Sequence, residues 1–387
     1  MVEWKKLGEV FEIRNGYTPS KNNPDYWENG TIPWFRMEDI RLNGGILSDS
    51  IQHITPASIK TSGLFPANTI IVATTATIGE HALVIVDSLA NQQFTALISR
   101  KSLTQSVLPR FVYYYCFKLD DWCKNHIRQG GFASVDMDGF KKYPFPIPSL
   151  SEQNRIVGIL DTFTASIDNL KEQIAQRRKQ YEYYRDELLD LEGKEEKDIH
   201  CWGEFCEMEK GNGVQKVDFV DEGVGCIHYG QIYTHYGPYT YETNKFVSKE
   251  VFEKARKASK GDIIMTDTSE NVEDICKSVA YLGEDDIAVS NHALIIKHQQ
   301  NPIFLSFSTQ TNSFLVQKRK YVVGAKVSGI KPDNLAQIKI YLPSLSEQQR
   351  IVSILDTFEA SIQNLEAQLE QRQKQYEYYR NKLLTFE

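Results

Sequence analysis

Apolar residues recur every three or four positions between Pro148 and Glu192, and the same pattern returns between Pro343 and Glu387. Steps that alternate between four and three over about five heptads are typical of a long helix with one seam for a partner helix. No Pro occurs inside either run, so each run is predicted to form a helix of about 40 residues, roughly 60 Å long. The predicted seam residues are Ile156, Leu160, Phe163, Ile167, Leu170 and Ile174 in the first run and Ile351, Leu355, Phe358, Ile362, Leu365 and Leu369 in the second.

The two helical segments are copies of each other. Aligned without gaps at an offset of 195 residues (343 − 148), they are identical at 32 of 45 positions, which indicates an internal duplication. The duplication continues outside the helices, because residues 7–16 match residues 202–211 and residues 32–36 align with 227–231 at the same offset. We therefore expect two copies of one unit, residues 1–192 and 196–387, whose middle parts have diverged.

The linker between the copies predicts how the helices pair. Residues 193–198 form a short, charged segment that spans at most about 20 Å, so the second globular half must begin near the end of the first helix. A second helix that packs along the first must then run in the opposite direction. We expect an antiparallel pair with one globular domain at each end.

Four polar positions of the helices carry further expectations. Ser149 and Glu152 have the spacing of a capping box at the start of the first helix. Each seam contains one charged position, Arg177 or Arg372. We expect the stem of each arginine to pack near Tyr181 or Tyr376, while its guanidinium reaches a glutamate, solvent or a partner protein.

Each globular half mixes short apolar runs with amphipathic segments, which favours α+β domains. The expected domain bounds are 1–147 and 199–342 for the globular halves, 148–192 and 343–387 for the long helices, and 193–198 for the linker. Expected strands are 69–76 and 81–87 in the first half and 262–267, 278–283 and 292–297 in the second. Expected helices are 108–128 and, despite its Ser, Thr and Asn content, 301–316.

Composition and charge exclude some function classes. The net charge of −7 argues against a sequence-blind binder of polyanions, although a local basic face remains compatible with nucleic acid. The six Cys residues have no CxxC spacing and are expected to be free, buried thiols. No apolar signal segment and no run of 18 apolar residues occur in the sequence, so a cytoplasmic protein without a membrane span is expected.

The sequence lacks recognisable catalytic motifs. It contains no GxGxxG after a strand, no phosphate-binding GxxxxGK[ST] loop, no HExxH and no GxSxG. It also lacks the Asn/Asp-Pro-Pro-Tyr/Phe segment with which amino-methyltransferases hold a target base. His228 and His292 lie beside predicted strands and are expected to be structural or contact residues, and no metal site is expected. These observations favour a recognition or scaffolding component that is not an enzyme.

Several basic and polar residues suit contacts with nucleic acid. Lys318, Arg319, Lys320 and Lys326 place four cations within nine residues, which can meet successive phosphates. Amides, and the acceptors of the polar loop 266–270, can bond base edges. The candidates are Arg36, Gln92, Gln93, Arg100, Lys101, Arg128 and Gln129 in the first half and Tyr229, Gln231, Ser269, Glu270, Lys318, Arg319, Lys320 and Lys326 in the second. A solvated surface charge run is the alternative for each cluster.

The motif at the start of each long helix carries a family resemblance. Each globular half ends in a Pro-x-Leu-x-Glu-Gln segment, seen at Pro148–Gln153 and Pro343–Gln348, and then enters a long helix. This arrangement resembles the DNA-specificity subunit of type I restriction-modification systems over the full chain. The resemblance implies two tandem target-recognition domains, each reading one half of a bipartite site in double-stranded DNA, and an antiparallel coiled coil that sets their spacing.

The resemblance also implies partners and the location of cofactors. Two adenine-specific methyltransferase subunits would dock on the helices, and restriction/translocase subunits would join the same complex. S-adenosylmethionine, ATP and Mg²⁺ would bind to those subunits, so no cofactor is expected on this chain. Two alternatives stay open: a coiled-coil adaptor with two globular heads that binds no DNA, and an enzyme with an unrecognised site. The globular halves differ between the two copies, whereas the helices are nearly identical. This difference favours a reader of two different half-sites over a symmetric adaptor.

Overall fold

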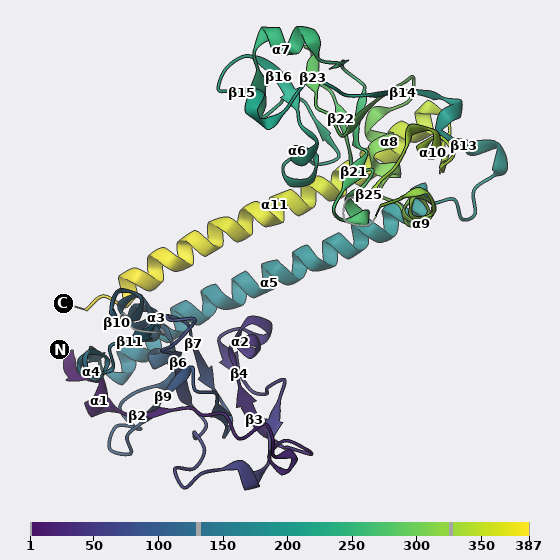
Figure 1. Cartoon of the computed structure of the whole chain (residues 1–387). Coiled ribbons are helices and arrows are strands. Elements are labelled where there is room, and N and C mark those ends of the chain that lie inside the picture. Colours follow the sequence, from purple (N-terminus) through teal and green to yellow (C-terminus); the bar gives the residue numbers. More distant parts are fainter. Residues whose placement is uncertain (1, 129–132, 325–327, 387) are drawn as a thin grey trace. The chain divides into compact units, whose positions relative to one another are not determined.

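The computed structural model describes residues 2–128, 133–324 and 328–386 and divides the chain into two compact units (Figure 1). One unit comprises Met1–Leu170 with Gln368–Glu387, and the other comprises Lys171–Ala367. Each unit therefore contains one globular half, the start of one long helix and the end of the other.

Both halves are built on a five-stranded sheet of the same topology. The order in the first half is β2 (Phe11–Asn15), β9 (Phe94–Ser99), β6 (Thr69–Ala73), β7 (His81–Val84) and β4 (Ile46–Leu47). The order in the second half is β14 (Cys206–Lys210), β24 (Ala293–His298), β20 (Ile263–Thr266), β22 (Ser278–Tyr281) and β17 (Tyr239–Thr240). In each sheet the last pair is parallel and the other neighbours are antiparallel. The prediction of one duplicated α+β fold is confirmed.

Smaller sheets complete each half. The first half adds β5 (His53–Ile54), β3 (Ile32–Phe35) and β8 (Leu89–Ala90) as one sheet, and the pairs β1 (Glu3–Lys6) with β12 (Pro144–Ile147) and β10 (Ile127–Arg128) with β11 (Ser134–Val135). The second half adds the sheet β15 (Phe219–Val220), β18 (Lys245–Val247), β16 (Val224–Ile227), β23 (Ile287–Val289) and β19 (Lys257–Ala258), and the pairs β13 (Ile199–Cys201) with β26 (Lys339–Tyr341) and β21 (Thr268–Ser269) with β25 (Ser328–Gly329).

The helices agree with the sequence pattern, with one exception. They are α1 (Leu7–Val10), α2 (Met37–Asn43), α3 (Pro109–Asn125), α4 (Met137–Lys142), α5 (Leu150–Leu189), α6 (Tyr229–Thr234), α7 (Lys249–Lys254), α8 (Pro302–Ser308), α9 (Asn312–Tyr321), α10 (Pro332–Leu335) and α11 (Leu345–Leu383). The expected single helix 301–316 is two helices, α8 and α9. The Thr311 hydroxyl accepts the N–H of Phe314 at 3.3 Å and so caps a new helix. None of the described helices is long and apolar enough to cross a membrane.

The two long helices pair antiparallel, as expected. In the second unit Arg178 of α5 is ion-paired with Glu366 of α11, whereas Tyr184, further along α5, stacks on the earlier residue Phe358. The stacked rings of Tyr184 and Phe358 have centroids 5.4 Å apart, and in the first unit Phe163 and Tyr379 stack at the same separation. The duplicated sequence therefore builds the same interhelical contact twice.

The guanidinium groups of the seam arginines find an aromatic partner that was not predicted. Arg177 lies with its guanidinium carbon 5.8 Å from the ring centroid of Phe358, and Arg372 lies 5.7 Å from that of Phe163. Each guanidinium thus lies near an aromatic ring of the opposite helix, because a delocalised guanidinium is attracted to the face of a π-system.

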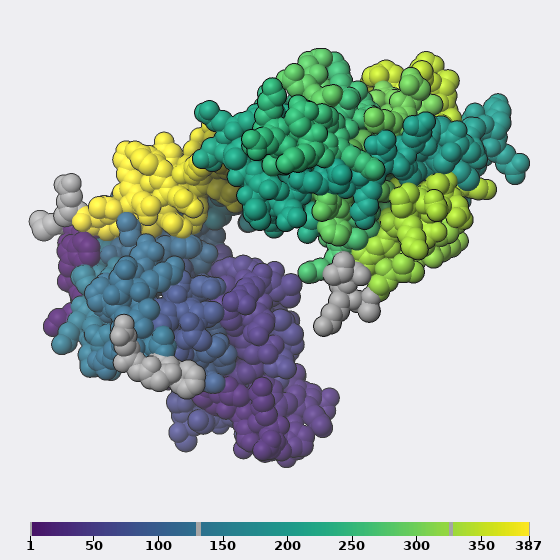
Figure 2. Space-filling view, turned by 45° about the horizontal axis from the view of Figure 1, so that its top comes forward, coloured from purple at the N-terminus to yellow at the C-terminus, as the bar shows by residue number. Residues whose placement is uncertain are grey.

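The ends of the helices lie in the globular cores, which the heptad pattern alone did not indicate. In the first unit Ile156 and Leu160, from the start of α5, are fully buried with Leu384, which follows α11, in the core of the first half. Figure 2 shows the yellow C-terminal end of the chain against the blue surface of the first half. In the second unit Ile351 and Leu355 are buried in the core of the second half. The end of α5 supplies Tyr181 and Leu189 to that core. Each core is therefore completed by both helices.

The Glu-Gln segment fastens each helix start to its domain. Gln153 is completely buried, and its side-chain nitrogen donates to the carbonyl oxygens of Ser106 and Pro148 at 2.8 Å. Its side-chain oxygen accepts the N–H of Leu108 at 2.9 Å. In the second half Gln348 accepts the N–H of Asn301 and donates to the carbonyl of Pro343 in the same way, while its other donor bond goes to the side-chain oxygen of Gln300. The predicted capping box forms only in part, because Ser149 accepts the N–H of Glu152 while the Glu152 carboxylate pairs with Arg155.

Replacing Gln153 by Ala is expected to lower the free energy of unfolding of the first half by about 3 kcal/mol. The substitution removes a fully buried side chain and leaves the N–H of Leu108 and the carbonyl groups of Ser106 and Pro148 without their partner. Urea-induced unfolding measures the effect. Gln176→Ala, at an exposed position of the same helix, should change stability by less than about 0.5 kcal/mol. Equal destabilisation by the two variants would contradict the role assigned to Gln153.

Candidate nucleic-acid interface

Loops from distant parts of the sequence meet at one edge of the main sheet in each half. In the first half the N–H of Thr74, just after β6, bonds the carbonyl of Gln93 at 2.9 Å. The N–H of Gly16, just after β2, bonds the carbonyl of Phe94 at 2.8 Å. The end of β2, the loop after β6 and the turn before β9 are therefore neighbours. The second half repeats this arrangement with β14, β20 and β24.

Three of the predicted residues of the first half come together beside this edge. Arg36, Gln92 and Gln93 line a hollow of about 430 Å³. The Arg36 guanidinium lies 5.8 Å from the ring of Trp34, and Gln92 accepts a hydrogen bond from the Thr18 hydroxyl at 2.5 Å. The hollow is lined by Thr18, Lys21, Trp34, Arg36, Met37, Glu38, Arg41, Thr77, Asn91, Gln92 and Gln93. Lys21 and Arg41 add two cations that the sequence did not single out.

The alignment of residues 32–36 with 227–231 is wrong by three residues. Phe35 pairs with Ala90 at the end of β3, and Ile227 pairs with Val289 at the end of β16. The next residue caps a helix in both halves, so Arg36 is equivalent to His228 and not to Gln231. The diverged loops contain a length difference that a gap-free alignment cannot represent.

Gln231 is engaged in structural hydrogen bonds. Its side-chain oxygen accepts the N–H of His228 at 2.7 Å, and its side-chain nitrogen donates to Asn244. Tyr229 lies next to it at the start of α6, with its ring edge-on to His292 at 5.4 Å between centroids. Of the two predicted residues on this helix, Tyr229 is the one placed at the sheet edge described above.

The other candidates of the first half do not belong to the same site. Arg100 and Lys101 follow the opposite end of β9, about 20 Å from Gln93 along a six-residue strand, and Arg100 donates to the carbonyl of Gly8. Arg128 is exposed and pairs with Asp136 and Asp138. Gln129 lies outside the described residues.

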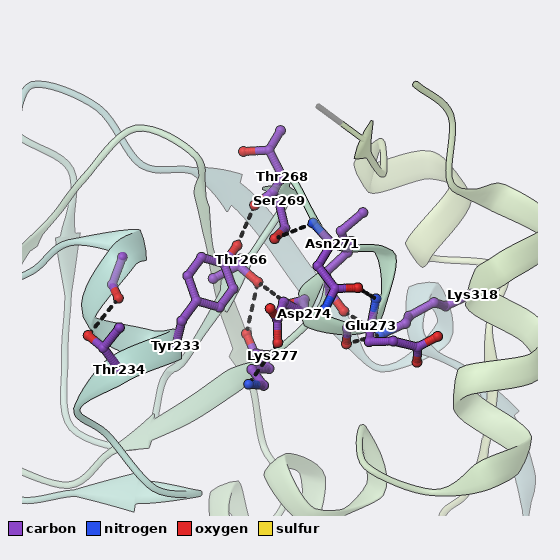
Figure 3. Close-up of polar contacts among 12 residues, drawn as sticks. Tyr233, Thr234, Thr266, Thr268, Ser269, Asn271, Glu273, Asp274, Lys277 and Lys318 are labelled. Carbon is purple, nitrogen blue, oxygen red and sulfur yellow. Dashed lines mark hydrogen bonds and ion pairs between the residues drawn. The ribbon is translucent and has the colours of Figure 1, made fainter. Parts of the chain in front are cut away.

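The predicted cation cluster of the second half contains one buried residue, Lys318, beside exposed neighbours. Lys318 is only 1 % exposed, and its ammonium donates to the carbonyl oxygens of Glu273 and Ile275 at 2.8 and 2.6 Å (Figure 3). Burial lowers the pKa of Lys318 from its ordinary value. Its ammonium is therefore bound to the protein and is not available to a phosphate. It fastens the loop after β20 to α9.

The neighbouring cations and the polar loop are placed as follows. Arg319 is exposed and pairs with Glu273 at 2.5 Å, Lys320 is exposed, and Lys326 lies outside the described residues. Ser269 accepts the N–H of Asn271 at 3.2 Å, while Glu270 is exposed. Figure 3 shows Tyr233 reaching from α6 to the carbonyl of Thr268, so that α6 and α9 both hold the loop 267–277.

Several residues at the two edges were missed by the sequence analysis. They include Lys21 and Arg41 in the first half and Lys210 and Asp267 in the second, where the Lys210 ammonium lies 2.7 Å from the Asp267 carboxylate. Asp267 could have been located from its position at the end of the predicted strand 262–267, whereas no predicted strand adjoins Lys21, Arg41 or Lys210. Residues at the same end of neighbouring strands share one edge of a sheet, even when they are far apart in sequence.

The edge of each half presents amides, hydroxyls, aromatic rings and a few cations. These groups suit contacts with base edges, because bases are read through directional hydrogen bonds. A continuous basic surface would instead suit phosphates, which are bound through their charge. The two halves place different side chains on the same backbone frame. This arrangement is what two readers of different sequences require.

Comparisons with known protein families cover both copies. The family model described as the type I restriction modification DNA specificity domain matches residues 1–177 and 194–372. The specificity subunit of the Escherichia coli type I restriction enzyme EcoprrI is 36 % identical over 375 residues, which are 92 % of this chain and 88 % of that protein. The *E. coli* EcoR124I/EcoR124II specificity subunit is 37 % identical over 203 residues, 49 % of this chain and 48 % of that protein.

Solved structures share the fold at low sequence identity. The type I restriction-modification S subunit from M. genitalium matches with a TM-score of 0.54 and 15 % identity, over 100 % of this chain and 97 % of that chain. A chain from a structure described as explaining complex assembly and conformational transition of the type I R-M system matches with a TM-score of 0.65 and 16 % identity, over 99 % and 97 %.

Two lysines of α9 provide a test of the divided cation cluster. Lys318→Met is expected to lower the free energy of unfolding of the second half by about 2 kcal/mol, because the carbonyl groups of Glu273 and Ile275 lose a buried donor. Lys320→Met, at an exposed position two residues away, should change stability by less than about 0.5 kcal/mol. Urea-induced unfolding of both variants measures the difference, and a stable Lys318→Met variant would show that the loop does not depend on this ammonium.

Proposed function

Because the chain belongs to the type I restriction modification DNA specificity family, we propose that it selects the DNA sequence on which a type I restriction-modification complex acts. Each globular half reads one half of a bipartite site in double-stranded DNA. The observation that carries this proposal is the combination of one duplicated fold with different side chains at the same sheet edge of each half.

The long helices connect the two readers and dock the partners. Two adenine-specific methyltransferase subunits bind the helices, and restriction/translocase subunits join the same complex. The interhelical contact at Tyr184 and Phe358 is repeated at Tyr379 and Phe163. This repetition supports two copies of one partner, because equivalent surfaces bind equivalent subunits.

The chain itself takes no catalytic role in this proposal. S-adenosylmethionine, ATP and Mg²⁺ bind to the partner subunits, and the complex acts in the cytoplasm on cellular or incoming DNA. A protein-only adaptor with two heads is a weaker alternative, because such an adaptor has no need for different side chains at equivalent positions of its heads.

The proposal is tested by expressing the chain with its methyltransferase subunit and mapping methylated adenines by single-molecule sequencing. The expected result is one bipartite motif with a fixed spacer. Absence of sequence-specific methylation by an assembled complex would contradict the proposed function.

The spacing is expected to follow the length of the helices. Inserting seven residues in register after Leu170 and another seven after Ala367 adds roughly 10 Å. That length corresponds to about three base pairs at 3.4 Å each. Methylation mapping should then show the same half-sites separated by a spacer about three base pairs longer. Altered half-sites with an unchanged spacer would show that the helices do not set the distance.

Residues 1–192 alone are expected to form a two-fold dimer with two identical readers. This fragment lacks Tyr376 and Leu384, which help to complete the core of the first half, but a second copy supplies Tyr181 and Leu189 at the equivalent positions. With the methyltransferase subunit, the dimer should modify an inverted repeat of the first half-site. Leu189→Asp in the fragment should abolish dimerisation. Modification of the original asymmetric site by the active fragment would refute the assignment of one half-site to each domain.

A further inference from the structure

Three equivalent positions of the two halves lie together at the sheet edge. Asn15 ends β2 and Lys210 ends β14, each in the same register with the neighbouring strand. The residues that follow β6 and β20, Thr74 and Asp267, each donate their N–H to the turn residue before β9 or β24. The positions are therefore Asn15, Thr74 and Gln93 in the first half and Lys210, Asp267 and His292 in the second.

In the second half these positions form a charged cluster. Asp267 is 3 % exposed, and one of its carboxylate oxygens lies 2.7 Å from the Lys210 ammonium. The other oxygen is buried, lies 3.9 Å from Nδ1 of His292 and has no hydrogen-bond partner among the described residues. The side chains of Lys210 and His292 are 54 % and 51 % exposed. The buried carboxylate thus holds the Lys210 ammonium, and the His292 imidazole lies beside it; both side chains remain open to a ligand.

In the first half the same positions are neutral. The Thr74 hydroxyl lies 2.8 Å from that of Thr95, and the Thr95 hydroxyl donates to the side-chain oxygen of Asn15 at 3.0 Å. Gln93 accepts a hydrogen bond from Asn91 at 3.2 Å. The edge of the first half therefore presents amides where the second half presents an ammonium and an imidazole.

A purely structural ion pair does not account for the difference. Thr74 and Asp267 have the same backbone bonds, since their carbonyl groups also accept an N–H at 2.9 Å, from Val135 and Ile330 respectively. The first half builds this frame without any charge, so the fold does not require an ion pair here. Burying Asp267 carries a desolvation cost that the fold could avoid. His292 also has a left-handed backbone with φ of 65°, a conformation concentrated at functional sites.

We propose that Lys210, assisted by His292, reads a guanine in the second half-site, and that Asp267 is the positioning residue for Lys210. This inference rests on the proposed DNA-recognition function. Guanine presents two acceptors, O6 and N7, in the major groove, and a lysine ammonium is one of the donors that suit this edge. A phosphate offers acceptors too, but the buried carboxylate cancels the charge of Lys210 and weakens the attraction to an anion. A cluster in which the charges of Lys210 and Asp267 cancel, and whose donors are directional, therefore fits a base edge better than a phosphate.

The experiment compares Lys210→Met with Lys260→Met in the full chain, expressed with the methyltransferase subunit. Lys260 is a matched control, because it is also 54 % exposed and ion-paired, with Glu284, in the same half. Binding of each complex is measured on duplexes that carry all four base pairs at each position of the second half-site. Lys210→Met should reduce the preference for guanine at one position by roughly tenfold to a hundredfold. The first half-site, the spacer and the Lys260→Met complex should remain unchanged.

A second variant distinguishes a loss of base preference from a loss of folding. Lys210→Asn and Asp267→Thr together install first-half residues at the two positions whose backbone pairing is the same in both halves. This variant should retain methylation while losing the same guanine preference. Asp267→Asn should affect the same base pair and no other, and its effect should be non-additive with that of Lys210→Met.

Two results would overturn the inference. Unchanged base preference in the second half-site for every variant would show that the cluster reads no base. Lys210 would be identified as a phosphate ligand by a uniform loss of affinity for all duplexes. The slope of log binding constant against log salt concentration would then also fall by about one, the value for one phosphate contact. A wild-type complex without any bipartite motif would instead contradict the proposed function.

Discussion

Each globular core buries apolar residues from the start of one long helix and the end of the other, and the remaining architecture depends on this packing. Ile156, Leu160 and Leu384 share the first core, while Ile351, Leu355 and Leu189 share the second. The buried amides of Gln153 and Gln348 fix where each helix leaves its domain. The helices are therefore parts of the domains as well as connectors between them. Sequence identity between the helix copies follows, because both must fit the same kind of core.

The fold could be predicted because its determinants are local or repeated. Heptad spacing identifies a helix without knowledge of its partner. The duplication supplies a second helix with nearly the same seam, so the two helices can be predicted to pair. Strands such as Ile263–Thr266 are short apolar runs that are buried on both faces. Contacts between helix and domain core were less visible, since residues such as Ile156 satisfy a coiled-coil seam and a globular core equally well.

The site could be predicted only in part, because it is assembled by tertiary contacts between loops. Arg36 and Gln92 are far apart in sequence and meet only through the pairing of β3 with β8. Lys318 appeared to belong to an exposed basic run, yet three-dimensional packing buries its ammonium beneath the loop 267–277. The equivalence of Thr74 and Asp267 is visible only in the backbone hydrogen bonds, since the diverged loops differ in length.

The position of Leu384 in the first core has a consequence for biosynthesis. The ribosome completes the first globular half long before it adds the final turns of α11 that this core requires. At about 5–20 residues per second, the remaining half of the chain takes on the order of tens of seconds. During that interval the nascent first domain exposes the apolar surface on which Tyr376 and Leu384 later pack. The end of α5 in another nascent chain on the same messenger RNA carries nearly the same residues. That segment therefore competes with the chain's own C-terminal segment for the exposed apolar surface.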